Sequence, residues 1–166
     1  MINIRKMKLD DVKQISIAFT QQGWNKPIEL YRNYYEEQEL GKRYILVAEY
    51  NNEFAGYITI IWESSYIIFQ ERNLPEIVDF NVLKKFQRKG IGRKLILSAE
   101  KIVKRKSQEV GIRVGLLEGY GQAQRLYVQL GYIPDGKGIS KDNYFFDYFD
   151  KTEVDDDLVI GFTKVF

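Results

Sequence analysis

The sequence contains no cysteine and no histidine, and these two absences narrow the chemistry available to it. Without cysteine there is no disulfide, no thiolate nucleophile and no zinc site built on sulfur ligands. Without histidine, the Ser-His-Asp triad and the usual imidazole metal sites are excluded as well. Any catalysis must therefore use carboxylates, tyrosine, lysine, arginine, hydroxyl groups or backbone groups.

The chain also lacks a strong net charge, a long apolar run and an apolar leader. Its formal net charge is +2 over 166 residues, so no global field indicates nucleic acid or a membrane as a partner. No apolar run approaches the roughly 20 residues that a membrane span needs, and residues 1–6 lack the apolar region of a signal peptide. We therefore expect a cytoplasmic protein, and the length and hydrophobic fraction favour a single domain over residues 1–166.

The periodicity of apolar residues predicts a mixed α/β architecture. Alternation indicates strands, and spacings of three and four indicate helices. The expected elements are a strand at 2–5, a helix from Asp10 or Asp11 to before Gly23, a helix at 28–40, a hairpin of 43–50 and 54–62, a strand at 77–83, a helix at 91–106, a strand at 113–117, a helix at 121–130, and final strands at 144–149 and 158–165. Residues 63–73 either prolong a strand or form an inserted turn, and residues 132–136 are expected to turn.

The most informative stretch runs from Phe86 to Arg93 and reads Phe-Gln-Arg-Lys-Gly-Ile-Gly-Arg. An apolar strand precedes it and an amphipathic helix follows, so the helix begins inside a glycine turn. Free N–H groups and the helix dipole suit a phosphate there, and Arg88 and Lys89 add charge. No Gly-Lys-Ser/Thr follows, which excludes a P-loop, and the turn does not follow the first strand as in a Rossmann unit. The residues favour a phosphate site over a plain tight turn.

Two segments together resemble the GNAT superfamily of N-acetyltransferases. Residues 82–92 resemble the family's strand and its Gln/Arg-x-x-Gly-x-Gly/Ala loop, and residues 123–132 resemble its Ala-x-x-Leu-Tyr-x-x-x-Gly-Phe segment. The order of elements also matches over nearly the whole chain. The resemblance implies a mixed, mostly antiparallel sheet flanked by helices and splayed between its fourth and fifth strands. It also implies acetyl transfer from acetyl-CoA, without a metal, to a primary amine of a small molecule or peptide, by direct attack through a tetrahedral intermediate.

The resemblance assigns the donor site to residues of the fourth strand and the glycine turn. The residues that match the family's coenzyme-binding positions are Phe80, Asn81, Val82, Arg88, Lys89, Gly90, Ile91, Gly92, Arg93 and Tyr127. Pantetheine is expected along the strand and pyrophosphate at the turn, where a Cβ at either glycine would stand between phosphate and backbone. Tyr127 matches the acid that protonates the departing thiolate, since a phenol with a reference pKa of about 10 holds its proton at neutral pH.

The base that deprotonates the acceptor ammonium is less well marked. Asp79 stands where several family members place an acid on the fourth strand, and it is preferred because that strand faces the coenzyme. Glu118 at the end of the fifth strand and a water relay are the alternatives. The chain departs from the family at Tyr120, where an Asn is frequent, and at Gly115, where some members carry a Glu.

Charge and aromatic residues bear on the acceptor. Ten Lys or Arg stand against one acid from Lys84 to Lys106, which we interpret as a solvated face without nucleic-acid binding, and seven acids stand against one base from Asp142 to Asp157. The acidic segment either attracts a cationic amine or is a solvated loop. The aromatics that either line an acceptor pocket or pack the core and a homodimer contact are Trp24, Tyr31, Tyr34, Tyr35, Tyr144, Phe145, Phe146, Tyr148 and Phe149. The runner-up function is a non-catalytic acyl-CoA-binding module.

Overall fold

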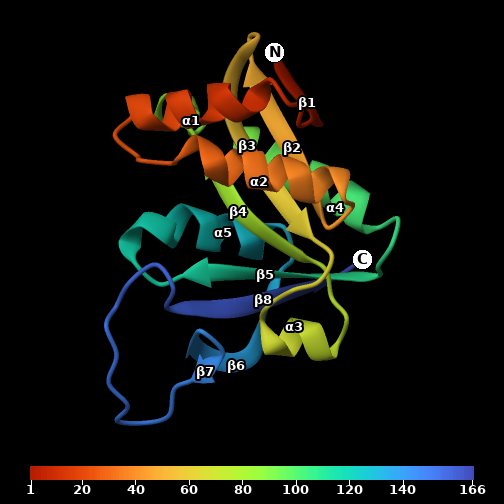
Figure 1. Cartoon of the computed structure of the whole chain (residues 1–166). Coiled ribbons are helices and arrows are strands. Elements are labelled where there is room, and N and C mark those ends of the chain that lie inside the picture. The colour runs from red at the N-terminus through yellow and green to blue at the C-terminus, as the bar shows by residue number, and fades with distance from the viewer.

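A computed structural model describes all residues from 1 to 166 and contains one eight-stranded sheet with helices on both faces (Figure 1). The strands lie in the order β1-β2-β3-β4-β5-β8-β6-β7. In chain order the elements are β1 (Ile2–Lys6), α1 (Asp11–Gln21), α2 (Ile28–Glu39), β2 (Arg43–Tyr50), β3 (Glu53–Ile61), α3 (Ile67–Glu71), β4 (Glu76–Val82), η1 (Lys84–Phe86), α4 (Ile91–Val103), β5 (Glu109–Gly115), η2 (Glu118–Tyr120), α5 (Gly121–Gln129), β6 (Ile133–Lys141), β7 (Tyr144–Phe145) and β8 (Val159–Val165). The predicted mixed α/β fold is confirmed.

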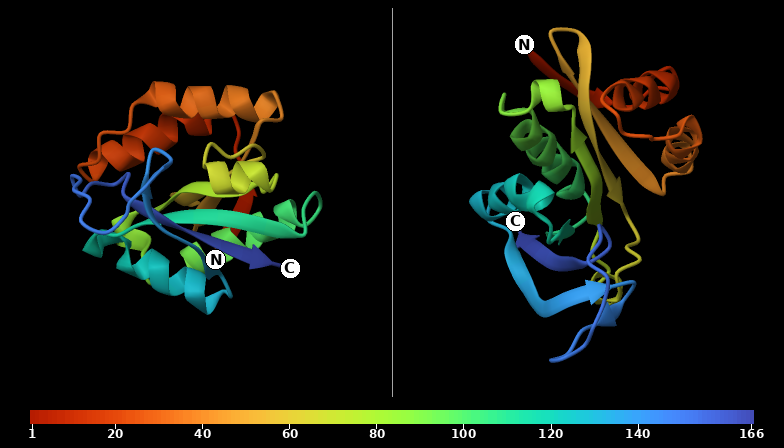
Figure 2. Two further views of the ribbon diagram at one scale, coloured as in Figure 1. Left: turned by 90° about the horizontal axis from the view of Figure 1, so that it is seen from below. Right: turned by 90° about the vertical axis from the view of Figure 1, so that its left-hand side faces the viewer.

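The helices form a layer on each side of the sheet. Figure 2 shows α1 and α2 over one face and α4 and α5 over the other. In α1 the buried residues Val12, Ile15 and Phe19 recur at the spacing of one helix face, and in α4 the same pattern buries Leu95 and Ala99. Each helix therefore packs its apolar stripe on the sheet. None of the helices combines the length and the apolarity needed to cross a bilayer.

Strands β4 and β5 pair over only a short stretch. They run parallel and are joined at Glu76↔Gly111 and Ile77↔Ile112, whereas β3 follows β4 as far as Val82. Beyond Ile77 the two strands therefore diverge, as Figure 1 shows. The predicted splay between the fourth and fifth strands is confirmed, and it leaves one edge of β4 without a strand partner.

Two sequence-based assignments near the C-terminus are wrong. Residues 132–136 do not end in a turn, because strand β6 runs through them with a register shift between Pro134 and Ile139. Gly136 and Gly138 adopt φ of 78° and 75°, so the residues that resemble a turn form a bulge inside the strand. The expected strand at 144–149 is reduced to the two residues of β7, because the Asp147 N–H bonds to the Asp150 carboxylate and turns the chain.

Smaller differences concern the element ends and the ambiguous segment 63–73. That segment forms the short helix α3, which a small separate core of Tyr66, Phe69 and Leu74 attaches to the sheet. Helix α4 ends at Val103, three residues before the predicted end, and β5 starts at Glu109 rather than at residue 113.

A buried ion pair at the start of α1 predicts acid sensitivity. Asp11 accepts hydrogen bonds from Arg5 Nη1 at 2.7 Å, Arg5 Nη2 at 2.8 Å and the Lys8 N–H at 2.7 Å. Burial raises the pKa of Asp11, but these donors outweigh it and leave the pKa below its ordinary value. Because the folded pKa lies below the unfolded one, the stabilisation is present at neutral pH and is lost as pH falls through the acid range.

We therefore expect Asp11→Asn to lower the free energy of unfolding at pH 7 by about 1.5–3 kcal/mol, the range for hydrogen bonds to charged groups. The difference from the unsubstituted protein should shrink toward pH 3, where the carboxylate is protonated in the unfolded chain. Urea unfolding at both pH values measures it. An equal difference at the two values would contradict the prediction.

Candidate active site

Strand β4 carries a bulge at Asp79 beside its open edge. The register with β3 gains an extra residue on β4 between Thr59↔Val78 and Tyr57↔Asn81. Asp79 has φ of 45°, in the left-handed region, which costs a non-glycine residue about 1–2 kcal/mol. The bulge redirects the Asp79 side chain and ends the regular pairing at this point.

The three strand residues expected to hold pantetheine lie on the unpaired part of β4. Phe80, Asn81 and Val82 all follow Ile77, after which β5 no longer accompanies the strand, and each is half-buried. An extended ligand is able to add itself to such an edge through backbone hydrogen bonds. The geometry thus provides an edge of the kind that the sequence interpretation requires.

The glycine loop (residues 86–93) places the N-terminus of α4 at the end of that edge. Arg88 and Gly90 have φ of 62° and 80°, and the helix begins at Ile91. The side chains of Arg88, Lys89 and Arg93 are exposed, and none of the ion pairs in the structure involves them. Ile91 is 1% exposed and packs in the core, so only its backbone can face a ligand. These unpaired cations add to the helix dipole at one place.

The two glycines have different roles, and the shared explanation given for them is wrong for Gly92. A Cβ on Gly90 would meet nothing within 4 Å, so its φ of 80° is what requires glycine. A Cβ on Gly92 would lie 2.9 Å from the Phe80 ring and 3.6 Å from Leu126. Gly92 is therefore the point where β4, α4 and α5 pack closely, and the ring of Phe80 fills the space beside it.

Tyr127 lies on α5, one residue after Leu126. Its side chain is 4% exposed, and its ring centroid lies 5.9 Å from that of Tyr132. No hydrogen bond joins its hydroxyl to another residue, and the oxygen is not completely buried. Burial raises the pKa of Tyr127, and proximity to Tyr120 adds to the effect. The phenol therefore stays protonated at neutral pH.

Asp79 accepts hydrogen bonds from four side chains on the α1–α2 side of the sheet. The Tyr57 hydroxyl donates to Oδ2 at 2.6 Å and the Tyr34 hydroxyl donates to the same atom at 3.0 Å. Asn81 Nδ2 and Lys26 Nζ lie 2.7 Å and 3.4 Å from Oδ1. Burial and the negative charge of Asp79 raise the pKa of Tyr57 well above its ordinary value, so Tyr57 remains a donor. Asp79 is thus a carboxylate held beside a cation and two phenols.

The structure also locates the alternative base, Glu118, and the two positions that depart from the family pattern, Gly115 and Tyr120. Glu118 is exposed in η2 and makes no hydrogen bond through its side chain. A Cβ on Gly115 would lie 2.5 Å from the Tyr120 ring, so the tyrosine occupies the space above this glycine. Burial, followed by the neighbouring Asp156 carboxylate, raises the pKa of Tyr120 to about 12. The Asn and the Glu of the family pattern are therefore both replaced by one aromatic ring.

Part of the acidic segment lies beside Asp79. A hollow of about 230 Å³ is lined by Asp79, Asp142, Asp156 and Asp157, with Arg113 among its other residues. The remaining acids lie elsewhere: Asp155 pairs with Lys141, and Asp150 bonds to Tyr144 and the Asp147 N–H. Tyr148 and Phe149 are 90% and 99% exposed, so these aromatics belong neither to the core nor to this hollow.

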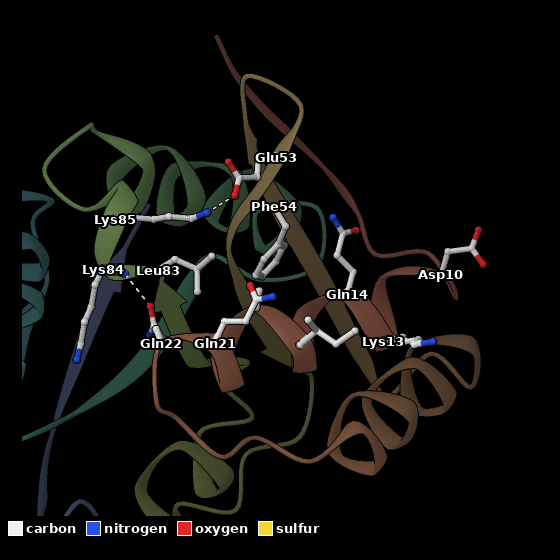
Figure 3. A pocket seen from close by; sticks show the side chains of 12 residues that line it. Asp10, Lys13, Gln14, Gln21, Gln22, Glu53, Phe54, Leu83, Lys84 and Lys85 are labelled. Carbon is white, nitrogen blue, oxygen red and sulfur yellow. Dashed lines mark hydrogen bonds and ion pairs between the residues drawn. The ribbon is translucent and has the colours of Figure 1, made fainter.

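A larger hollow of about 600 Å³ lies between α1, the start of β3 and the segment after β4 (Figure 3). Lys84 and Lys85 stand at its rim, and the Lys84 N–H donates to Gln22 Oε1 at 3.0 Å. This bond ties the end of α1 to the segment that leads into the glycine loop. None of the predicted site residues lines this hollow.

Two members of the Asp79 cluster were missed by sequence reasoning. Tyr57 pairs with Asn81 across β3 and β4, so a correct register of the predicted hairpin against the fourth strand would have found it. Lys26 lies in the connection between α1 and α2, and no motif or periodicity marks it.

Comparisons with known proteins agree with this geometry. Residues 9–132 match the model of the Acetyltransferase (GNAT) family, and a search of the curated proteins finds no match. Among solved structures, yncA from Salmonella typhimurium, solved with its cofactor acetyl-CoA, has a TM-score of 0.70 and 18% identity, covering 99% of this chain and 93% of its own. The ribosomal-protein-S18-alanine N-acetyltransferase from Escherichia coli gives 0.70 and 15%, covering 98% and 92%.

A spermidine N-acetyltransferase chimera involving Vibrio cholerae gives a TM-score of 0.70 and 16% identity, covering 99% of this chain and 95% of its own. At these identities the structural matches establish the fold alone. The family match extends over three quarters of the sequence and includes the glycine loop and Tyr127. The chain belongs to the GNAT acetyltransferase family.

Proposed function

We propose that the protein is an N-acetyltransferase that moves the acetyl group of acetyl-CoA to a primary amine of a small molecule or peptide. The observation that carries this proposal is the open edge of β4, which begins beside Asp79 and ends at the cationic N-terminus of α4. A donor laid along this edge has its acyl end near a carboxylate and its phosphates near unpaired cations. We also propose that residues 1–166 work as one cytoplasmic domain, alone or as a homodimer.

The residues present suit coenzyme A. The backbone of Phe80, Asn81 and Val82 would accept pantetheine as an added strand, because β5 leaves that edge free. The N–H groups at the start of α4, with the exposed Arg88 and Arg93, would bind the pyrophosphate. The open space beside Gly90 gives a phosphate room to approach the backbone.

The chemistry then needs one acid and one base. The protonated phenol of Tyr127, whose hydroxyl makes no hydrogen bond within the chain, suits the acid that gives a proton to the departing thiolate. Asp79 suits the base because it already contacts an ammonium, whereas Glu118 is exposed and unpartnered. The N–H groups after the bulge would stabilise the oxyanion of the tetrahedral intermediate.

The proposal names the class of the acceptor, a primary amine, and not the compound. The structurally similar proteins include one enzyme named for an alanine of ribosomal protein S18 and one named for spermidine. The hollow beside Asp79, with three further aspartates, favours an acceptor that carries positive charge.

A thiol-release assay with acetyl-CoA tests the proposal against the runner-up, a module that binds acyl-CoA without turnover. The panel should contain polyamines, aminoglycosides, amino acids and peptides with free N-termini. We expect thiol release that depends on the amine. Tight binding of acetyl-CoA without release for any amine would favour the binding module instead.

Replacing Asp79 by asparagine is expected to lower kcat for the best amine by about 10²-fold or more, because the amide accepts no proton. The dissociation constant of acetyl-CoA should change little, because the coenzyme would be held by the backbone of β4 and by the glycine loop, whereas the Asp79 side chain bonds to Tyr34 and Tyr57. Glu118→Gln is the matched control and should keep its activity. A larger loss of kcat in Glu118→Gln than in Asp79→Asn would assign the role of the base to Glu118 instead.

A further inference from the structure

The carboxylate proposed as the base, Asp79, already contacts an amine of the chain itself. Lys26 Nζ lies 3.4 Å from Asp79 Oδ1 and 3.3 Å from the Tyr57 hydroxyl. It also lies over two aromatic rings, 5.5 Å from the centroid of Phe19 and 5.9 Å from that of Tyr57. A carboxylate, a phenol oxygen and two ring faces are the groups that bind an alkylammonium.

Hydrogen bonds and ring packing hold the connection that carries Lys26. The contact of Lys26 with Asp79 therefore differs from the changing contacts of a mobile surface lysine. The Trp24 N–H donates to the Phe19 carbonyl at 2.9 Å, and the two rings stack at 5.8 Å. Ser16 Oγ donates to the Lys26 carbonyl at 2.7 Å. Only 22% of the Lys26 side chain is exposed, although most lysines extend into water. The ammonium is thus directed at Asp79 by both ends of its connection.

A counter-ion role alone would also place a lysine near Asp79. That role, however, does not need a primary amine at the point where β4 opens toward a donor. Phe80, the first residue of the proposed donor edge, follows Asp79 directly, so an acyl group on that edge and Lys26 Nζ flank the same carboxylate. The lysine stem has four rotatable bonds and is able to bring its nitrogen to the roughly 3–3.5 Å at which reaction occurs.

We propose that Lys26 is an acetylation site of the chain on itself. The inference rests on the proposed function, because acetyl-CoA is the donor. Asp79 takes a proton from the Lys26 ammonium and passes it to solvent, and the free amine attacks the thioester carbonyl carbon. The C–N bond forms first and gives a tetrahedral intermediate, whose C–S bond then breaks. The thiolate takes a proton from Tyr127, and the second amine proton restores Tyr127 through water. The products are acetyl-lysine, coenzyme A thiol and one proton.

The modification has a consequence for the acceptor site. Acetyl-lysine carries no charge, so the ion pair with Asp79 is lost and an incoming ammonium no longer competes with a tethered one. Acetylated protein should therefore bind a cationic acceptor more tightly than unmodified protein does. Self-acetylation would in this way prepare the site for its external substrate.

The test is incubation of the full chain with acetyl-CoA and no added amine, followed by intact mass and peptide mapping. We expect one acetyl group on Lys26, at a rate per molecule that does not depend on protein concentration. Lys26→Arg should abolish it. Tyr127→Phe should slow it by about 10²-fold, which chemical acetylation without catalysis would not do. Lys84→Arg is the matched control, since Lys84 Nζ lies 5.4 Å from the Trp24 ring centroid but has no carboxylate partner.

The outcomes separate this inference from the proposed function. A thiol-release assay with the best external amine is run in parallel on the same protein. Turnover of that amine without acetyl-Lys26 overturns the inference and leaves the function intact. Acetylation that spreads over exposed lysines, survives Tyr127→Phe, or rises with protein concentration also overturns it. Loss of both reactions in correctly folded protein rejects the proposed function itself.

Discussion

Replacing Tyr127 by phenylalanine is expected to lower kcat by about 10²–10⁴-fold, the usual contribution of a general acid. Negative charge develops on the sulfur of coenzyme A as the C–S bond breaks, and a positioned acid neutralises it by giving a proton. In the proposed mechanism the phenol of Tyr127 would be the donor, because burial raises its pKa and keeps it protonated at neutral pH. Phenylalanine keeps the ring and removes only the hydroxyl group.

The dissociation constant for acetyl-CoA separates an acid from a binding group. The coenzyme would be held mainly by β4 and the glycine loop, so Tyr127→Phe should change this constant much less than it changes kcat. Equal losses in both quantities would make Tyr127 a residue that binds the coenzyme sulfur. Stopped-flow binding and steady-state thiol release measure the two.

Tyr132→Phe is the matched control for this substitution. Tyr132 is 1% exposed, its ring lies 5.9 Å from that of Tyr127, and its hydroxyl is buried without a hydrogen-bond partner. Each variant removes one hydroxyl oxygen from the same pair of packed tyrosine rings. We expect Tyr132→Phe to keep both kcat and stability, so a loss of activity in it equal to that of Tyr127→Phe would point to packing rather than to proton transfer.

The sequence was sufficient for the features that local patterns determine. The stripe of Leu95, Ala99 and Val103 indicates which face of α4 is buried, and the glycine loop indicates where that helix starts. The splay of the sheet, in contrast, came from the resemblance, because no local pattern states how far β4 and β5 stay paired. The bulge in β6 was missed for a related reason: Gly136 and Gly138 have the same left-handed φ in a bulge as in a turn.

The contacts around Asp79 could not be predicted because the cluster is assembled from distant segments. Lys26, Tyr34, Tyr57 and Asp79 come from four separate parts of the chain, and only the folded chain brings their polar atoms together. The bulge adds to the difficulty, since it reverses the side-chain alternation of β4 that a reader of the sequence would assume. The glycine loop, in contrast, is a contiguous stretch between β4 and α4, and its place between a strand and a helix was predicted for that reason.

The ion pair between Glu76 and Arg113, at the point where β4 and β5 separate, gives the largest expected effect on stability. Glu76 on β4 is fully buried, and its carboxylate accepts hydrogen bonds from Arg113 Nε at 2.6 Å and from Ser64 Oγ at 2.5 Å. Glu76 belongs to one of the only two residue pairs that join β4 to β5, and Arg113 follows the other pair on β5. The pair therefore closes the sheet at the point from which the donor edge opens.

Replacing Arg113 by methionine should lower the free energy of unfolding by about 3–5 kcal/mol, because it leaves the Glu76 carboxylate buried without its cation. Urea unfolding at pH 7 measures the loss. The double variant Glu76→Leu with Arg113→Met removes both charges and should recover most of it, since an apolar pair of similar volume replaces a buried ion pair at little cost. If Arg113→Met lowers the free energy of unfolding by less than about 1 kcal/mol, the range of ordinary surface changes, the ion pair does not stabilise the junction of β4 and β5.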